Sequence, residues 1–347
     1  MQKKENYPLF FSKIYMYRSF TRLIMAGVIL DAKDKKILYE LDLNGREFIS
    51  TIAKRVGLSK EVVNYRIKRL QEKGVLEGFH AIINPSKTGY LVYRLHIKYQ
   101  NVTPDKEKEL IQYFSSHQNI GWVTAYEGLY DMAILYWARD AYEFREKCDE
   151  LLSQYGKYFH TTKQSIILQI HGFKHNYLFN SHDYTEAVVG GKVEPAPLDE
   201  IDMKILHLLA ADCRRTTLEI GKELGLSPNT VKYRIKKLID NKVIVGFRTI
   251  INANVLGYQH YKLFIQFYEH TEKTRQKIIS YLKISPHVIY VTEALGLADL
   301  EFEAQVKDIA QLHELIRNLK LQFGSLIRDT SSALIFKEHR INYLPSI

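Results

Sequence analysis

Hydrophobic side chains recur at helical spacing in two stretches of nearly the same sequence. Val63, Ile67 and Leu70 stand at i, i+4 and i+7 within residues 58–70, and the same spacing returns within residues 226–238. This spacing places the apolar side chains on one face of a helix and leaves the other face to polar residues. A serine precedes each helix, where its hydroxyl can accept a hydrogen bond from an otherwise unpaired backbone N–H.

The two stretches belong to a long internal repeat. A constant shift of 168 residues aligns Leu30–Tyr90 with Leu198–Tyr258 without a gap, and 27 of the 61 pairs are identical. The same shift aligns Gly-Leu-Tyr-Asp at 128–131 with Gly-Leu-Ala-Asp at 296–299. Repetition at a fixed interval indicates that one structural unit occurs twice along the chain.

The first part of each unit predicts three helices followed by a hairpin. Asp31 and Asp199 stand as caps before the first helix. The second helix ends at Gly57 or Gly225, which can adopt the left-handed conformation that closes a helix. The third helix is the basic one, and residues 74–83 predict a short strand, a turn and a returning strand. This order is that of a winged helix-turn-helix.

The second part of each unit changes to the alternating pattern of strands. In the first unit it predicts strands at 91–97, 121–127, 132–137 and 165–170 and helices at 104–114 and 141–154. The order is βαββαβ, a ferredoxin-like fold. The expected fold class is therefore α+β, with two tandem units that each join a winged helix-turn-helix to a βαββαβ domain.

The chain divides into six expected segments. They are an N-terminal extension (1–29), a winged helix-turn-helix (30–84), a βαββαβ domain (85–170), a linker (171–197), a second winged helix-turn-helix (198–252) and a second βαββαβ domain (253–347). The linker is expected to be exposed because it carries Gly, Pro and charged residues. Whether residues 1–24 belong to the native protein stays open, since Met25 stands just before the first unit.

The net charge of +10 favours a polyanionic partner, nucleic acid before an anionic membrane. Basic charge concentrates near the third helices. Residues 227–248 hold six Lys or Arg against one Asp, and residues 59–80 hold five against three Glu. No apolar run approaches the roughly 18 residues that span a bilayer, and two cysteines do not form a disulfide framework. A cytoplasmic location without a membrane partner is expected.

An ordered set of motifs resembles the Lrp/AsnC family, the leucine-responsive or feast/famine regulators. The motifs are Leu-Asp, Lys-Ile-Leu, Gly-Leu-Ser, Val-x-Tyr-Arg-Ile-Lys-x-Leu, Gly-Phe and Ile-Ile-Asn, and they occur twice. The resemblance implies double-stranded DNA as partner and control by a small amino-acid-like effector. It also implies pairing of the βαββαβ domains, here within one chain as a pseudo-dimer, where the tether raises the effective concentration. A higher homo-oligomer stays open.

The resemblance further implies which residues contact DNA. Lys and Asn can reach base edges in the major groove, whereas Arg66, Arg69, Arg234 and Lys237 are expected at phosphates. The first set is Ser59, Lys60, Glu61, Asn64, Tyr65, Arg66, Lys68 and Arg69. The second set is Ser227, Asn229, Thr230, Lys232, Tyr233, Arg234, Lys236 and Lys237. Because the sets differ, we expect an imperfect palindrome that the second module binds more tightly and with greater salt sensitivity. For each residue the alternative is an ordinary solvent-facing side chain.

An effector site is implied at the repeated glycine turns. Gly128, Asp131, Gly296 and Asp299 match the family's turn near its ligand pocket, where an Asp could pair with an effector amine. The alternative is structural, because glycine permits the turn and Asp can accept from backbone N–H groups. Ala298 replaces Tyr130 in the second copy, so two pockets would differ.

A cofactor or metal site, an enzymatic activity and sequence-blind DNA binding are the remaining alternatives for this sequence. No cofactor and no metal are expected, since His171 and His175 have helical ligand spacing but no Cys or carboxylate completes a set. The chain is expected not to be an enzyme. The enzymatic alternative resembles the siroheme decarboxylases, which share this fold, and it would need His and Arg converging on substrate propionates. The final strands lack a dense cluster of that kind. A sequence-blind architectural DNA-binding protein is the remaining alternative.

Overall fold

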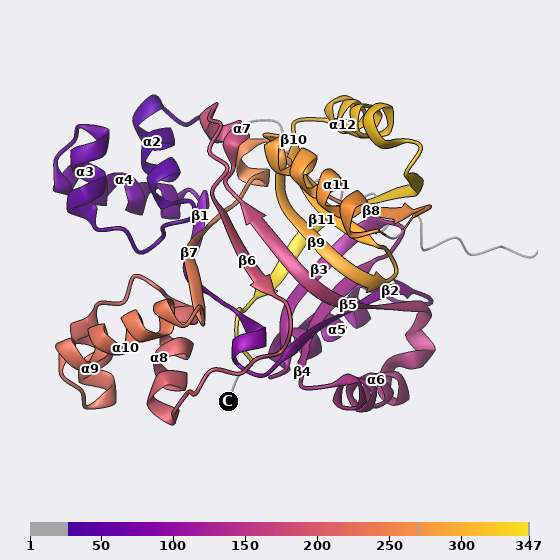
Figure 1. Ribbon diagram of the computed structural model, residues 1–347, viewed down its shortest axis with the longest axis horizontal. Coiled ribbons are helices and arrows are strands. Elements are labelled where there is room, and N and C mark those ends of the chain that lie inside the picture. Colours follow the sequence, from indigo (N-terminus) through magenta and orange to yellow (C-terminus); the bar gives the residue numbers. More distant parts are fainter. Residues whose placement is uncertain (1–26, 270, 346–347) are drawn as a thin grey trace, which may run out of the picture.

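The computed structural model describes residues 27–269 and 271–345. Nearly all of the N-terminal extension expected at 1–29 lies outside the described residues. Two helix-turn-helix modules lie on one side of a large curved sheet, and the helices of the βαββαβ domains cover its outer surface (Figure 1). Among the described residues, no helix is long and apolar enough to cross a membrane.

The two units contain the same elements in the same order. The first unit contains α2 (Ala32–Leu41), α3 (Ile49–Val56), α4 (Lys60–Glu72), β1 (Leu76–Ile83), β2 (Leu91–Tyr99), α5 (Pro104–Ser116), β3 (Ile120–Gly128), β4 (Met132–Ala138), α6 (Ala141–Tyr155) and β5 (Phe159–Phe173). The second contains α8 (Glu200–Ala211), α9 (Thr217–Leu224), α10 (Pro228–Asp240), β7 (Ile244–Ile251), β8 (Gln259–Phe267), α11 (Glu272–Ile284), β9 (Val288–Gly296), β10 (Leu300–Val306), α12 (Ile309–Phe323) and β11 (Ile327–Ile341). Short 3₁₀ turns at Pro85–Lys87, Gly156–Tyr158 and Asn254–Leu256 join some of them.

The strands of the two βαββαβ domains form one continuous sheet. Its order is β2-β4-β3-β11-β8-β10-β9-β5, and pairing of β2 with β5 closes these strands into a barrel. The crossover strands β5 and β11 are each fifteen residues long, whereas the final strand of the first unit was expected to span only residues 165–170. Half of each pairs within its own unit and the other half with the opposite unit, as β5 with β9 and β11 with β3. The units are therefore joined by main-chain hydrogen bonds along two seams.

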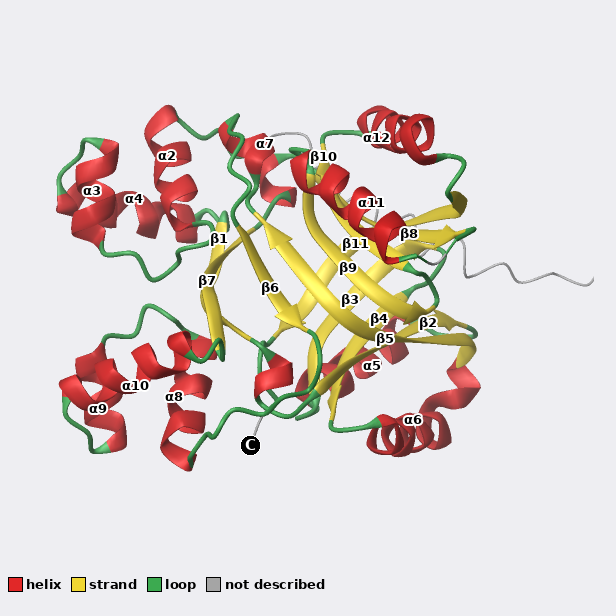
Figure 2. Ribbon diagram, viewed as in Figure 1, coloured by secondary structure: helices red, strands yellow, loops and turns green. Residues whose placement is uncertain are grey.

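The segment expected to form a hairpin is a single strand. Residues 76–83 run straight as β1 and pair antiparallel with β7 of the other unit, with Phe79 opposite Thr249. The local hairpin prediction is wrong because the backbone groups find their partners across the repeat and not by turning back. The resulting two-stranded ribbon (β1 with β7) links the two helix-turn-helix modules (Figure 2).

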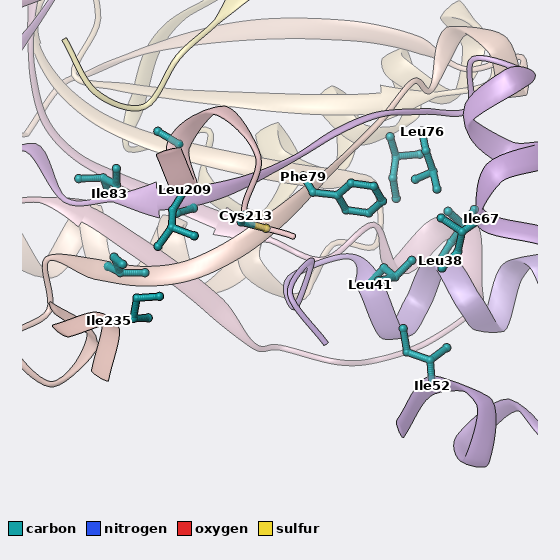
Figure 3. Packing of buried hydrophobic residues seen from close by; sticks show 14 of the residues in the cluster. Leu38, Leu41, Ile52, Ile67, Leu76, Phe79, Ile83, Leu209, Cys213 and Ile235 are labelled. Carbon is teal, nitrogen blue, oxygen red and sulfur yellow. The ribbon is translucent and has the colours of Figure 1, made fainter. Parts of the chain in front are cut away.

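The ribbon and both modules share one hydrophobic core. Leu38, Leu41 and Ile67 of the first module belong to the same buried cluster as Leu209 and Ile235 of the second. Figure 3 shows Phe79 of β1 between the two groups of side chains. Because interiors pack at crystal-like density, a shared core holds the two modules in a defined relation.

The helix-turn-helix helices begin and end at the capping residues that the sequence predicts. Asp31 accepts a hydrogen bond from Asp34 N at 2.8 Å, and Asp199 accepts from Asp202 N at 2.8 Å, so both first helices are capped as predicted. Gly57 and Gly225 have φ of 66° and 68°, the left-handed conformation expected at the end of the second helices.

The segment 171–197 is not simply an exposed linker. The strand β5 continues to Phe173, and α7 (Asn176–Phe179) and β6 (Glu186–Gly190) follow, with β6 added to the free edge of β5. His175 is buried and binds Asp42 through its ring nitrogen at 2.9 Å and its backbone N–H at 2.7 Å. Tertiary contacts of this kind fold a segment whose composition indicates a loop.

Candidate nucleic-acid interface

The third helix of each module is amphipathic as predicted. Ser59 caps α4 by accepting from Val62 N at 3.3 Å, and Ser227 caps α10 by accepting from Thr230 N at 3.1 Å. The predicted apolar stripe of each helix is buried in the shared core, namely Val63, Ile67 and Leu70 of α4 and Val231, Ile235 and Leu238 of α10. Most of the predicted DNA-contacting residues are exposed. The exposed set is Ser59, Lys60, Glu61, Asn64, Tyr65 and Lys68 on α4 and Ser227, Asn229, Thr230, Lys232, Tyr233, Lys236 and Lys237 on α10.

Large aromatic side chains stand among these polar residues. Tyr65 is 64% exposed and Tyr233 is 69% exposed. A tyrosine so exposed contributes little to packing, but it offers a ring and a hydroxyl to a partner. Backbone phosphates are commonly contacted by Tyr hydroxyls as well as by basic side chains.

Arg66, Arg69 and Arg234 have partners inside their own modules. Arg66 binds Asp31 at 2.6 Å and Asp34 at 2.8 Å, and Arg69 binds Asp34 at 2.7 Å. The hydrogen bond from Arg66 is the main cause that lowers the pKa of Asp31. Both arginines therefore point from α4 toward α2, where Asp34 is buried, and their ion pairs hold α4 against α2.

The second module repeats this brace with one arginine. Arg234 binds Asp199 at 2.7 Å and the buried Asp202 at 2.7 Å. Lys237, which stands where α4 has Arg69, is exposed. The phosphate role expected for Arg66, Arg69 and Arg234 stays a prediction, and the geometry gives all three a structural contact that the sequence did not indicate.

The exposed faces of the two helices carry different charge. On α4 the exposed Lys60 and Lys68 stand beside Glu61, whereas on α10 the exposed Lys232, Lys236 and Lys237 have no acidic neighbour before Asp240. The face of α10 is therefore the more positive one. This difference in charge remains when the arginines held in ion pairs are not counted.

The repeated glycine turns lie where the two units meet. Gly128 has a φ of 118° and pairs with Ala333, and Gly296 has a φ of 123° and pairs with Ser165. A Cβ at Gly296 would lie 2.4 Å from the Gln164 carbonyl oxygen, so the crossing strand requires glycine there.

The two aspartates of these turns bind the neighbouring strand. Asp131 accepts from Tyr99 N at 2.8 Å and pairs with Lys98 at 3.0 Å. Asp299 accepts from Phe267 N at 2.8 Å. These contacts favour the structural interpretation of the turns, and an effector role there remains a prediction.

Sequence reasoning missed a group of charges inside the barrel. Lys262 is fully buried and binds Glu301 and Glu303, each at 2.9 Å, and Arg94 of the other unit also binds Glu301. His260 binds Glu303 at 3.1 Å. The available signal was alternation, because every second residue of β8 and β10 points inward and those positions carry charges among apolar neighbours.

These contacts set the protonation of the buried groups. Burial alone would raise the pKa of Glu301, but Arg94 and Lys262 outweigh burial and hold the pKa at about 2. Burial lowers the pKa of His96, which lies in the same interior, to about 3, so this imidazole is neutral at physiological pH. The interior thus holds ionised carboxylates and a neutral histidine.

Comparisons with known proteins match the helix-turn-helix modules and the whole units. Residues 198–239 match the AsnC-type helix-turn-helix domain, and residues 30–77 match a winged helix-turn-helix DNA-binding domain. A helix-turn-helix-type transcriptional regulator of Methanocaldococcus jannaschii is 33% identical over 119 residues, which are 34% of this chain and 79% of that protein. The transcriptional regulator LrpA of Pyrococcus horikoshii is 31% identical over 143 residues, 41% of this chain and 98% of that protein.

One solved structure resembles the complete two-unit arrangement. The siroheme decarboxylase NirDL covers 91% of this chain and 94% of its own, with a TM-score of 0.58 and 14% identity. At that identity the likeness concerns the fold alone. The two sequence relatives named above match 34% and 41% of this chain, about the length of one unit, and the LrpA match covers nearly all of that protein. The chain belongs to the Lrp/AsnC family of helix-turn-helix transcriptional regulators.

Proposed function

We propose that the protein is a sequence-specific DNA-binding transcriptional regulator whose two helix-turn-helix modules read one duplex. The observation that carries this proposal is the pair of exposed basic helices, α4 and α10, joined through the ribbon and a shared core. A helix of this kind docks in the major groove with its exposed side chains at base edges and phosphates. Two modules in a defined relation can then reach two half-sites of one site.

The single chain is proposed as the DNA-binding unit. The edges β3, β5, β9 and β11, which would otherwise be free to pair with another chain, already pair with each other. The difference in charge between α4 and α10 favours an imperfect palindrome, with the α10 half-site bound more tightly.

Selection of bound duplexes from a random pool tests the proposal directly. A regulator is expected to enrich one site with two related half-sites and to prefer it over random duplex by about a thousandfold or more at physiological salt. Binding that barely distinguishes the enriched site from random DNA would instead favour a sequence-blind architectural DNA-binding protein. Light scattering of the complex reports whether one chain or more occupies each site.

Matched lysine variants test the asymmetry. We expect Lys236→Ala to lower both the affinity and the salt slope more than Lys68→Ala does, because the face of α10 is the more positive one. Lys277→Ala, at an exposed position of α11, serves as a control for a change in net charge alone. Equal losses and equal slopes for the two variants would contradict the proposed asymmetry.

The arginine braces provide a sharper test of which residues touch DNA. Arg234→Ala is expected to destabilise the second module, because the buried Asp202 loses its partner. Once measured on folded protein, its salt slope should equal that of the wild type, unlike the slope of Lys236→Ala. A reduced salt slope for Arg234→Ala would show that Arg234 contacts a DNA phosphate after all.

An enzyme on the same fold is the second candidate, favoured by the whole-chain likeness to NirDL and by the basic and histidine side chains inside the barrel. The cavity between the ribbon and the barrel measures about 160 Å³, below the roughly 300–1,000 Å³ typical of pockets for drug-sized ligands. A tetrapyrrole is larger still, so this cavity does not fit one. Purified protein that carries a visible tetrapyrrole absorption band and does not bind DNA would favour the enzyme.

A further inference from the structure

A cavity of about 160 Å³ lies under the ribbon, at the end of the barrel. Its walls are mostly apolar and aromatic, and they come from both units. Among the lining residues are Trp122, Trp137, Tyr290, Tyr343, Arg248 and Glu338. An apolar cavity of about 150 Å³ is large enough to hold benzene, so the space admits a ligand of roughly that bulk.

Arg248 projects into this region without a counter-ion in contact. Its side chain is 3% exposed, yet no carboxylate oxygen of the described residues lies within 4.0 Å of the guanidinium. Nη2 donates to the Phe173 carbonyl at 3.2 Å, while Nη1 has no hydrogen-bond partner in the described part of the chain. The guanidinium carbon lies 4.5 Å from the ring centre of Tyr290. Buried charges in proteins are normally paired, since an unpaired one is costly.

Two nearby acids act on Arg248 electrostatically without contacting it. The Asp42 carboxylate is bound by His175, at 2.7 and 2.9 Å. The Glu303 carboxylate, which also lines the cavity, is bound by Lys262 and His260. The chain also leaves room at this point. A Cβ at Gly172 would come within 3.1 Å of Arg248 Nη1, so glycine keeps the donor uncovered.

Other unsatisfied donors line the same cavity. Arg94 Nε and Trp137 Nε1 are buried without partners among the described residues. Trp122 Nε1 is occupied, because it donates to Glu338 Oε1 at 2.7 Å. The carboxylates that line this space, Glu303 and Glu338, already accept from neighbouring side chains. The lining side-chain atoms that have no partner among the described residues are hydrogen-bond donors, and such a set fits an anionic oxygen ligand.

We propose that this cavity is a binding site for a small organic carboxylate with a compact apolar body. The guanidinium of Arg248 would bind the carboxylate, and the aromatic walls would enclose the apolar part. Charged groups of this kind are recognised through paired N–H···O bonds from an arginine fork. The repeat does not provide a second copy of this site. The residue of the first unit that corresponds to Arg248 is His80. His80 and Arg248 are paired in the register of β1 and β7.

The chain supplies its own probe for binding. Its two tryptophans, Trp122 and Trp137, both line the cavity. We would titrate the full chain, without DNA, with sodium benzoate and separately with L-valine, using sodium chloride at equal ionic strength as the blank. Saturable change in tryptophan fluorescence, matched by calorimetry, is the expected result for benzoate.

Variants decide whether Arg248 is responsible. Arg248→Gln should weaken binding at least tenfold, as expected for loss of a charge-assisted pair. Arg328→Gln, an exposed arginine on β11 that donates to Gln266, should leave binding unchanged. Arg248→Met should also raise the urea midpoint of the unliganded protein, because it removes a buried charge that lacks a contacting partner.

Each outcome decides the proposal. Valine binding without benzoate binding supports the carboxylate site and assigns the ammonium group to Glu338, in which case Glu338→Gln should abolish binding. Failure of both ligands to saturate at tens of millimolar, or equal binding by Arg248→Gln, overturns the proposal. A lower urea midpoint for Arg248→Met also overturns it, since Arg248 would then be a structural residue. DNA binding does not enter this experiment, so its failure leaves the proposed function intact.

Discussion

Glu301 offers the most direct test of how the two units are held together. It is fully buried, and it binds Arg94 of the opposite unit and Lys262 of its own. Substitution by glutamine keeps the shape of the side chain and removes its charge. Lys262 keeps Glu303 as a partner at 2.9 Å, but Arg94 loses the one carboxylate that it contacts within the described residues.

The magnitude follows from the pKa of Glu301. A folded-state pKa of about 2 against an ordinary value of 4.5 corresponds to about 3 kcal/mol of stability at neutral pH. Breaking one partner out of a buried ion pair costs about 3–5 kcal/mol in measured cases, so two routes agree on the scale. Because the folded pKa is depressed, this stability is present above pH 4.5 and is lost as the pH falls toward 2.

Urea unfolding of the wild type and Glu301→Gln at several pH values measures this contribution. We expect a difference of about 3 kcal/mol at pH 7 that shrinks to roughly half at pH 3, because at pH 3 the carboxyl of the unfolded chain is already protonated while that of the folded protein is still mostly ionised. Glu200→Gln serves as control, because that side chain is 80% exposed and pairs with Lys204 on the helix surface. Its urea midpoint should not change.

Two results would refute this reasoning. A difference below about 1 kcal/mol at pH 7 would show that the interior ions are solvated or mutually compensated. A difference as large at pH 3 as at pH 7 would show that glutamine harms packing and that charge is not the cause. The double replacement Arg94→Met with Glu301→Leu should recover most of the lost stability, since an apolar pair of similar volume can replace a buried ion pair.

The remaining predictions concern the helix-turn-helix modules. Asp202→Asn should lower stability by about 2 kcal/mol, because the buried acceptor of Arg234 loses its charge, and urea unfolding measures the loss. Gly225→Ala should cost about 1 kcal/mol in the same assay, since φ of 68° disfavours residues with a Cβ; an unchanged midpoint would show that the helix end relaxes. Lys237→Ala, at the expected phosphate contact, should weaken DNA binding and reduce the salt slope by about 0.9 while leaving the urea midpoint unchanged.

The helices and their ends could be read from the sequence because their causes are local. The cap at Ser227, the closing Gly225 and the apolar spacing of Val231 and Ile235 all act within a few residues. The repeat then carried each local assignment from one unit to the other. The candidate DNA residues followed from the same helices, and the structure leaves most of them exposed.

Local sequence patterns could not predict contacts between residues that are distant along the chain. Residues 165–170 were expected as the whole final strand, whereas β5 spans fifteen residues since each half pairs with a different unit. The sequence likewise marked Arg234 as a basic residue on a polar face. It could not show that the side chain turns back to the buried Asp202.

The sequence by itself determined the two-unit organisation, the helix-turn-helix modules and the basic faces of α4 and α10. Periodicity and capping depend on neighbouring residues, and the repeat is visible when the sequence is aligned with itself. Only the tertiary structure decided that β1 pairs with β7, that Arg94 reaches Glu301 across the barrel, and that Arg248 faces a cavity without a contacting counter-ion. These features depend on which main-chain and charged groups, distant in sequence, are brought together by the folded chain and which are left without a partner.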